Sequence, residues 1–109
     1  MVVGVLQVEL YLPDAMNLKD KRRVVCSLKD RLHREYRVAV AEVDRQDAHR
    51  LAVLGLATVS NGAVHARQVL DAIVRELRAD RRFVLNGHQV EILTGQTDGA
   101  TGAAQVGRQ

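Results

Sequence analysis

Residues 51–59 read Leu-Ala-Val-Leu-Gly-Leu-Ala-Thr-Val, an uncharged and almost wholly apolar run. Successive side chains of a β-strand point to opposite faces of the sheet. A strand that is apolar at nearly every position is therefore typical of the centre of a sheet, with both of its faces covered. We expect this strand to decide the fold and the other segments to be arranged around it.

The start of the chain has the pattern of a strand with one buried face. Over residues 2–12 every even position is Val, Gly or Leu, whereas the odd positions include Gln7 and Glu9. A period of two predicts a strand with one dominant core face. Pro13 ends this strand, because proline has no N–H to donate to a neighbouring strand.

Two segments carry apolar residues at the three- and four-residue spacing of an amphipathic helix. They are residues 18–36 and residues 63–80. Either Asp14 or Asn17 is suited to cap the first helix, because both side chains can accept a hydrogen bond from the free N–H groups of the first turn.

Two further strands complete the pattern. We expect them at residues 38–44 and 83–93, the second interrupted by a turn or bulge at Asn86 and Gly87. The order strand–helix–strand–strand–helix–strand, with right-handed crossovers, predicts an α+β fold, the ferredoxin-like βαββαβ sandwich. In it a four-stranded antiparallel sheet carries both helices on one face, and its first and third strands are central.

The length of 109 residues fits one domain. We place this domain at residues 1–93 and expect residues 94–109, which hold four of the eight glycines, to be a disordered tail. The single cysteine forms no internal disulfide, and the apolar start is too short to cross a bilayer, so we expect a cytoplasmic protein without a membrane segment. The sequence has no zinc spacing, phosphate-binding loop or nucleophile motif, and we expect no catalytic residue, metal or cofactor.

Helices on one face of the sheet leave its other face open. The third strand nevertheless has apolar candidates for that open face, namely Leu51, Val53, Ala57 and Val59. Either this is a tolerated apolar surface, or a second subunit covers it. We favour self-association, which would make the protein a homo-oligomer through the open sheet face.

Basic residues are concentrated in one segment. The formal net charge is +3, but residues 17–37 hold eight Lys and Arg against three Asp and Glu. This segment therefore carries +5 and the rest of the chain −2. When Val24, Leu28 and Leu32 are placed inward on a helical projection, a ridge of polar side chains points outward: Lys19, Arg22, Arg23, His33 and Arg34.

Such a ridge suits the phosphates of a nucleic acid, whose affinity for proteins comes mainly from Lys and Arg. The alternative is a solvated helix face partly neutralised by Asp30 and Glu35. The candidate phosphate contacts are Lys19, Lys21, Arg22, Arg23 and Arg34. The chain has only three aromatic residues and none in the third strand, which disfavours stacking of RNA bases on the sheet, the common mode of RNA binding by this fold.

Two other groups of side chains offer chemistry. Glu42 and Asp44 are predicted to share a strand face, where paired carboxylates bind Mg²⁺ or act as acid and base; otherwise they belong to a solvated face. Cys26 is predicted to lie outward on the first helix. With no second cysteine, we expect it to be an incidental surface thiol.

Three stretches together resemble the YlxP-like family of bacterial domains, whose function is unknown. They are Asn-Leu-Lys-Asp-Lys-Arg at residues 17–22, Ala-Glu-Val-Asp at 41–44 and Val-Ser-Asn at 59–61. The resemblance spans residues 2–93 and implies a ferredoxin-like fold. Genes of this family tend to lie beside those of translation initiation and ribosome maturation factors, which implies a ribosome- or RNA-related role. It supplies no catalytic residues, and Cys26 stands where a basic residue is more usual, which interrupts the ridge.

The sequence therefore predicts a non-enzymatic accessory protein that associates with RNA or the ribosome through its basic first helix. Ribosomal RNA or a ribosomal particle is the expected partner. The alternative is a homodimeric protein-interaction module that uses the open sheet face and binds no RNA. A small enzyme built on Glu42 and Asp44 is the third hypothesis.

Overall fold

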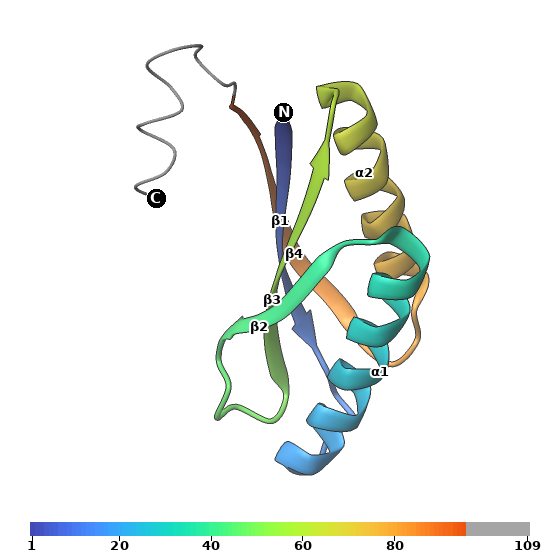
Figure 1. Cartoon of the computed structure of the whole chain (residues 1–109). Helices are drawn as coiled ribbons and strands as arrows, with labels where there is room; N and C mark the ends of the chain where they lie inside the picture. The colour runs from blue at the N-terminus through green and yellow to red at the C-terminus, as the bar shows by residue number, and fades with distance from the viewer. Residues whose placement is uncertain (96–109) are drawn as a thin grey trace.

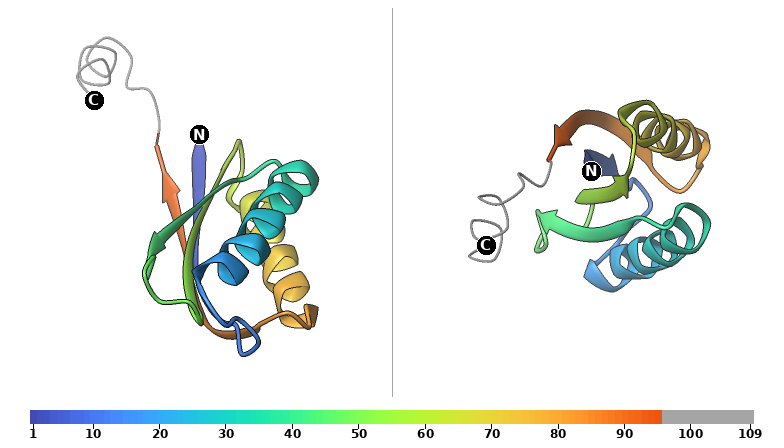
Figure 2. Two further views of the ribbon diagram at one scale, coloured as in Figure 1. Left: turned by 90° about the horizontal axis from the view of Figure 1, so that it is seen from below. Right: turned by 45° about the horizontal axis from the view of Figure 1, so that its top comes forward.

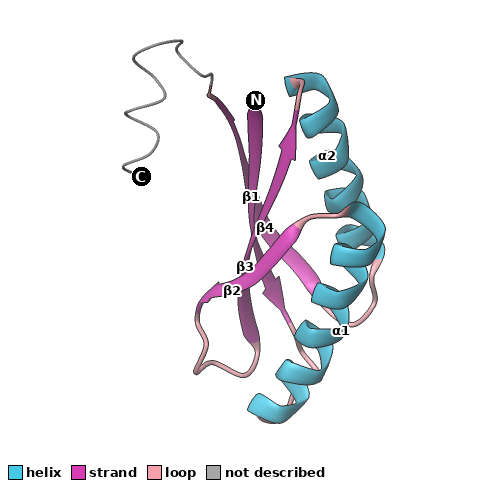
Figure 3. Cartoon of the chain, viewed as in Figure 1, coloured by secondary structure: helices cyan, strands magenta, loops and turns pink. Residues whose placement is uncertain are grey.

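The computed structural model describes residues 1–95 of the chain. Its elements are β1 (Val2–Tyr11), α1 (Leu18–Tyr36), β2 (Ala39–Asp44), β3 (Leu51–Ser60), α2 (Ala63–Ala79) and β4 (Val84–Thr94). The strands form one antiparallel sheet in the order β2-β3-β1-β4, and both helices lie on one of its faces (Figures 1 and 3). The predicted ferredoxin-like fold is confirmed, and so are the central positions of β1 and β3. Neither of the described helices is both long and apolar enough to cross a membrane.

The two ends of the described chain meet at one end of the paired strands β1 and β4. The N-terminal ammonium donates to Gly95 O at 3.0 Å, and Gly95 N–H donates to Met1 O at 2.9 Å. The last strand includes Thr94, which the sequence had assigned to the tail. The remainder of the predicted tail, residues 96–109, lies outside the described residues.

The core lies between the sheet and the helix layer (Figure 2). Every even position of the first strand segment is buried, as its period of two predicted. The large buried side chains are aliphatic and come from both layers: Leu6, Leu10, Leu28, Leu32, Leu54, Leu56, Leu70, Ile73 and Leu77. Each such side chain contributes about 1.5–3 kcal/mol when it leaves water. This aliphatic layer fixes both helices on the sheet.

Hydrogen bonds define the two ends of α1. Asn17 Oδ1 accepts from Asp20 N–H at 2.9 Å, and the Asp20 carboxylate accepts from Met16 N–H at 2.9 Å, a reciprocal arrangement like a capping box. Asn17 is thus the cap that the helix uses. The helix ends at Arg37, whose φ of 57° is left-handed and whose N–H donates to His33 O at 3.0 Å.

Each edge strand contains a β-bulge. The register of β2 against β3 shifts between Glu42 and Asp44, which makes Val43 the extra residue. The register of β4 against β1 shifts as well, and it leaves Asn86 unpaired, so the predicted interruption is a bulge within a continuous strand. A bulge redirects the side chains that follow it. In β2 this changes the face on which Asp44 lies.

Charged side chains join α1 to the C-terminal end of α2. Arg31 Nε lies 3.0 Å from Glu76 Oε2, and Arg31 Nη2 lies 3.5 Å from Asp80 Oδ2. Arg82 donates to both oxygens of Asp80, at 3.0 and 2.7 Å, and the Tyr36 hydroxyl donates to Glu76 at 2.8 Å. The Arg82 guanidinium holds the pKa of Asp80 at about 2, below the ordinary 3.8. The network therefore depends on an ionised Asp80.

Replacing Asp80 by Asn should lower the free energy of unfolding by about 1–2 kcal/mol at pH 7, because the side chain is only 9% exposed and solvent screens the pair in part. The pKa is lower in the folded state than in the unfolded state. The stabilisation is therefore fully present above about pH 4 and is lost as the pH falls toward about 2. The difference between wild type and Asp80→Asn, measured by urea denaturation from pH 7 to pH 3, should shrink.

The matched control is Asp71→Asn on the exposed side of α2, since Asp71 makes no ion pair within residues 1–95. It should show no comparable dependence on pH. An Asp80→Asn deficit that stayed constant down to pH 3 would contradict the assigned ion pair.

Candidate nucleic-acid interface

The outward face of α1 carries the predicted ridge. Val25, Leu28 and Leu32 point toward the sheet, and the cations on the other side of the helix are exposed. We define the basic ridge as the exposed cations of α1 and its C-cap: Lys19, Arg22, Arg23, Arg34 and Arg37. His33 and Cys26 are exposed on the same helix, as predicted.

Within residues 1–95, the cations of the basic ridge form no ion pair. Asp30 and Glu35, the acids predicted to neutralise part of the ridge, also make none in this part of the chain. Asp20 is occupied by the N-terminal cap of the helix. The cations of the ridge are therefore not held by carboxylates of the described residues and are free to contact an anion, although Asp20, Asp30 and Glu35 lower the net charge of the helix.

Lys21 does not belong to this surface, and its prediction as a phosphate contact is wrong. Its side chain is only 1% exposed. Nζ donates to the carbonyls of Arg45, Gln46 and Leu51 at 2.9, 3.3 and 3.2 Å, and it lies 2.8 Å from Glu42 Oε2. These four oxygens offset the several kcal/mol, roughly, that burying an isolated ammonium costs. Lys21 therefore ties α1 to the β2–β3 hairpin and is not available to a ligand.

Glu42 and Asp44 do not share a face, which corrects the second site prediction. Glu42 lies on the helix side of the sheet in contact with Lys21. The bulge at Val43 turns Asp44 to the open side, where its carboxylate accepts from Arg45 N–H at 2.8 Å. The predicted carboxylate pair is therefore not formed. In the described part of the chain, no three His, Cys, Asp or Glu side chains gather closely enough to hold a metal ion.

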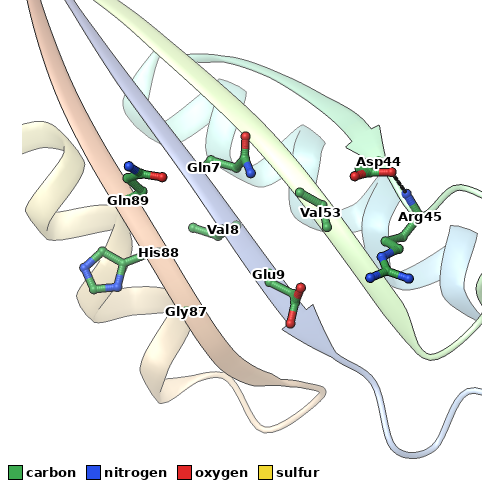
Figure 4. A pocket seen from close by; sticks show the side chains of 9 residues that line it. All are labelled: Gln7, Val8, Glu9, Asp44, Arg45, Val53, Gly87, His88 and Gln89. Carbon is green, nitrogen blue, oxygen red and sulfur yellow. Dashed lines mark hydrogen bonds between the residues drawn. The ribbon is translucent and has the colours of Figure 1, made fainter.

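One half of the open sheet face is polar. It contains a hollow of about 280 Å³, around which stand Gln7, Glu9, Asp44, Arg45 and Gln89 (Figure 4). The carboxylates of Glu9 and Asp44 flank the hollow. The two bulged edges of the sheet border the same half, because both register shifts occur in the row of Glu9.

The other half of the open face is apolar except for Glu91, which pairs with Val5 and is exposed. We define the open apolar patch by the residues around a depression of about 290 Å³, together with the neighbouring Val59: Val5, Ala39, Ala41, Val43, Gly55, Ala57 and Val59. Val43 covers the backbone of Gly55, since a Cβ at position 55 would lie 3.0 Å from Val43 Cγ1. Val59 is 69% exposed. Of the predicted open-face residues, Ala57 and Val59 belong to this patch, whereas Val53 lies in the floor of the polar hollow (Figure 4) and Leu51 is half-buried beside Tyr11.

The sheet layer and the helix layer differ in charge. The four strands contain no Lys or Arg and four acids, whereas the two helices contain ten Lys and Arg and five acids. A polyanion is therefore attracted to the helix layer and repelled by the sheet layer. Tyr11 is the one aromatic residue in the described strands and is 37% exposed. The sheet thus lacks the aromatic platform on which this fold commonly stacks RNA bases.

Together these features define a small ferredoxin-like domain with a cationic helix layer and a half-apolar open sheet. Residues 3–91 match the family described as "Protein of unknown function (DUF503)", and the chain belongs to this family. A curated relative is the uncharacterized protein YlxP of Bacillus subtilis (strain 168), which is 27% identical over 73 residues, 67% of this chain and 79% of the relative. The family predicted from the three motifs is confirmed.

Among solved structures, the chain is similar to a de novo designed protein with a ferredoxin fold, determined by solution NMR. The two are 14% identical with a TM-score of 0.48, over 93% of this chain and 91% of the designed one.

Replacing Lys21 by Met should lower the free energy of unfolding by about 2–4 kcal/mol, because three carbonyls and Glu42 lose their partner together. Glu42→Gln should lower the free energy of unfolding by a smaller amount, since Lys21 keeps its three carbonyl acceptors. The control is Lys19→Met, two positions away and exposed, with an expected change within about 0.5 kcal/mol. Chemical denaturation measures all three, and equal stabilities of Lys21→Met and Lys19→Met would contradict the buried contact.

Proposed function

We propose that this chain is a non-enzymatic accessory protein that binds RNA through the basic ridge in the cytoplasm. The supporting observation is the division of charge: exposed cations without ion partners in residues 1–95 stand on the helix layer, and the strands carry none. Contacts of Lys and Arg with phosphates supply most of the sequence-independent affinity for nucleic acids. Ribosomal RNA, alone or in a ribosomal particle, is the proposed partner, in keeping with the family resemblance.

The ridge suits backbone contacts better than base contacts. Its arginines present planar donor groups that match two phosphate oxygens at once. Lys21 fixes one half of α1 and Arg31 the other, so the ridge stands on a helix that is already ordered, and little freedom is lost on binding. Contacts of this kind orient a protein on RNA without reading its sequence.

Replacing Arg22 and Arg23 together by Glu should weaken binding to ribosomal RNA by at least about tenfold at moderate salt, because two phosphate contacts become repulsive. Filter binding at several salt concentrations measures the loss. The matched control carries the same change of charge at exposed positions of α2, Arg67→Glu with Arg78→Glu, and should stay within about threefold of wild type. Equal losses in both double variants, or binding that ignores salt, would contradict a role of the ridge.

The second candidate function is a homodimeric protein-interaction module that binds no RNA, and the open apolar patch favours it. We propose a second copy of this chain as the occupant of the patch. The patch carries no charge, so a two-fold axis through it brings apolar side chains together. Glu91, which pairs with Val5, then stands at the border of the contact, the polar half of the sheet lies beyond it, and the two cationic helix layers face away from each other. The dimer is also compatible with RNA binding on the helix side.

Val59→Asp places a charge in the patch at a position that is 69% exposed, so it should shift the chain to monomer without unfolding it. The control, Val64→Asp on α2, is 73% exposed and lies outside the patch. Sedimentation equilibrium measures the association constant, which should fall at least about tenfold for Val59→Asp and hardly at all for Val64→Asp. A wild-type chain that is monomeric at every soluble concentration would refute the dimer.

A further inference from the structure

We infer that the RNA bound by the basic ridge is double-helical, and that the ridge spans a groove with one group of cations on each phosphate backbone. This inference rests on the proposed RNA binding and adds the structural class of the RNA. Three observations support it: the division of the exposed ridge cations into two groups, the position of α1 in a layer of two helices, and the scarcity of aromatic residues.

The basic ridge consists of two cationic groups with a gap between them. Lys19, Arg22 and Arg23 form the first group, and Arg34 and Arg37 form the second. The exposed side chains in the gap include Cys26, Ser27 and Asp30, which carry no positive charge, and the one ridge-side cation between the groups, Lys29, is half-buried. A single strand that followed the helix would pass its phosphates over the Asp30 carboxylate. Two backbones separated by a groove avoid that contact.

The separation of the groups suits this arrangement. Arg23 and Arg34 are eleven positions apart, which is about 16 Å along an α-helix axis. The two groups together extend over about 27 Å along the helix axis. Two groups this far apart can contact two separate phosphate backbones at once without any change in the helix.

The seating of α1 limits which groove it can face. Leu28 and Leu32 hold the helix against the sheet, and Arg31 joins it to α2. Because α1 and α2 lie side by side on one face of the sheet (Figure 2), α1 presents only its outer side, as part of a layer that is broader than one helix. The major groove of A-form RNA is deep and narrow, whereas its minor groove is wide and shallow. A broad cationic layer therefore fits across the minor groove of an RNA duplex better than into the major groove.

Electrostatics favours the duplex as well. Each phosphate neutralised contributes about 0.9 to the salt dependence for a duplex but only about 0.7 for a single strand, because the duplex has the denser charge. Proteins that bind single strands add aromatic stacking, at about 1–3 kcal/mol for each base. In residues 1–95 Phe83 is buried, Tyr36 packs against the core, and Tyr11 lies on the sheet and not on the ridge, so the ridge has no exposed aromatic ring for stacking. A site that relies on charge alone gains more from the duplex.

The test compares three probes by fluorescence anisotropy: a blunt RNA duplex of about twenty base pairs, one of its strands in an unstructured sequence, and the DNA duplex of the same sequence. We expect the RNA duplex to bind at least about tenfold more tightly than the strand, with a slope of log K against log salt near −4.5 for five phosphates. The DNA duplex should bind more weakly than the RNA duplex. Arg22→Glu with Arg23→Glu, and separately Arg34→Glu with Arg37→Glu, should each reduce duplex binding to the level of the single strand.

The outcomes separate this inference from the proposed function. If single-stranded RNA binds as tightly as the duplex, and the ridge variants bind both more weakly, the duplex assignment is overturned and the proposed RNA binding stands. A DNA duplex that binds as tightly as the RNA duplex would overturn the A-form assignment. A protein that binds none of the probes would overturn both proposals. Circular dichroism of each double variant establishes that losses are not caused by unfolding.

Discussion

The buried ammonium of Lys21 fixes the position of α1 on the sheet. Its four oxygen partners come from β2, from the turn after β2 and from the start of β3, so one side chain orders α1, an edge strand and a hairpin together. With Lys21 inside, the opposite side of α1 must face solvent, and that side carries the basic ridge. The two stretches that link the chain to its family at residues 17–22 and 41–44 supply Lys21 and its partner Glu42. These two motifs therefore contain the two partners of a buried ion pair that stabilises the fold.

The ion pairs of the described residues leave the division of charge between the layers in place. Glu42 is the strand carboxylate that contacts a cation, and that cation belongs to a helix; the remaining strand acids lie on a sheet without Lys or Arg. The carboxylates between the helices, Glu76 and Asp80, are held by Arg31 and Arg82. The cations left on the outer surface of α1 are thus the ones that a polyanion meets first. We propose RNA binding there and self-association on the opposite face, and the two surfaces do not compete for space.

Much of the fold could be predicted from the sequence because its signals are local. The period of two in β1 and the cap at Asn17, one of two candidates, depend on residues close in the chain. Asn86 and Gly87 indicated an interruption of β4, but the pairing with β1 makes it a bulge and not a turn. The candidate site was harder to predict, because whether a charged side chain is buried or exposed depends on groups that are distant in the chain. Lys21 stands on the same helical stripe as the buried Val25, Leu28 and Leu32, a spacing that signals a buried amine, but its oxygen partners lie in another part of the chain. Likewise, no turn residue marks the bulge at Val43 that moves Asp44 off the face of Glu42.

The central claim is that the helix layer, and not the open sheet face, meets RNA. The most direct measurement is the change in backbone amide NMR signals when an RNA duplex is titrated into the protein. We expect the largest changes at ridge positions such as Arg22, Arg23 and Arg34, with residues of the open face such as Gln7 and Val5 unchanged. Changes concentrated on the open face of β1 and β3, with α1 unaffected, would contradict the account.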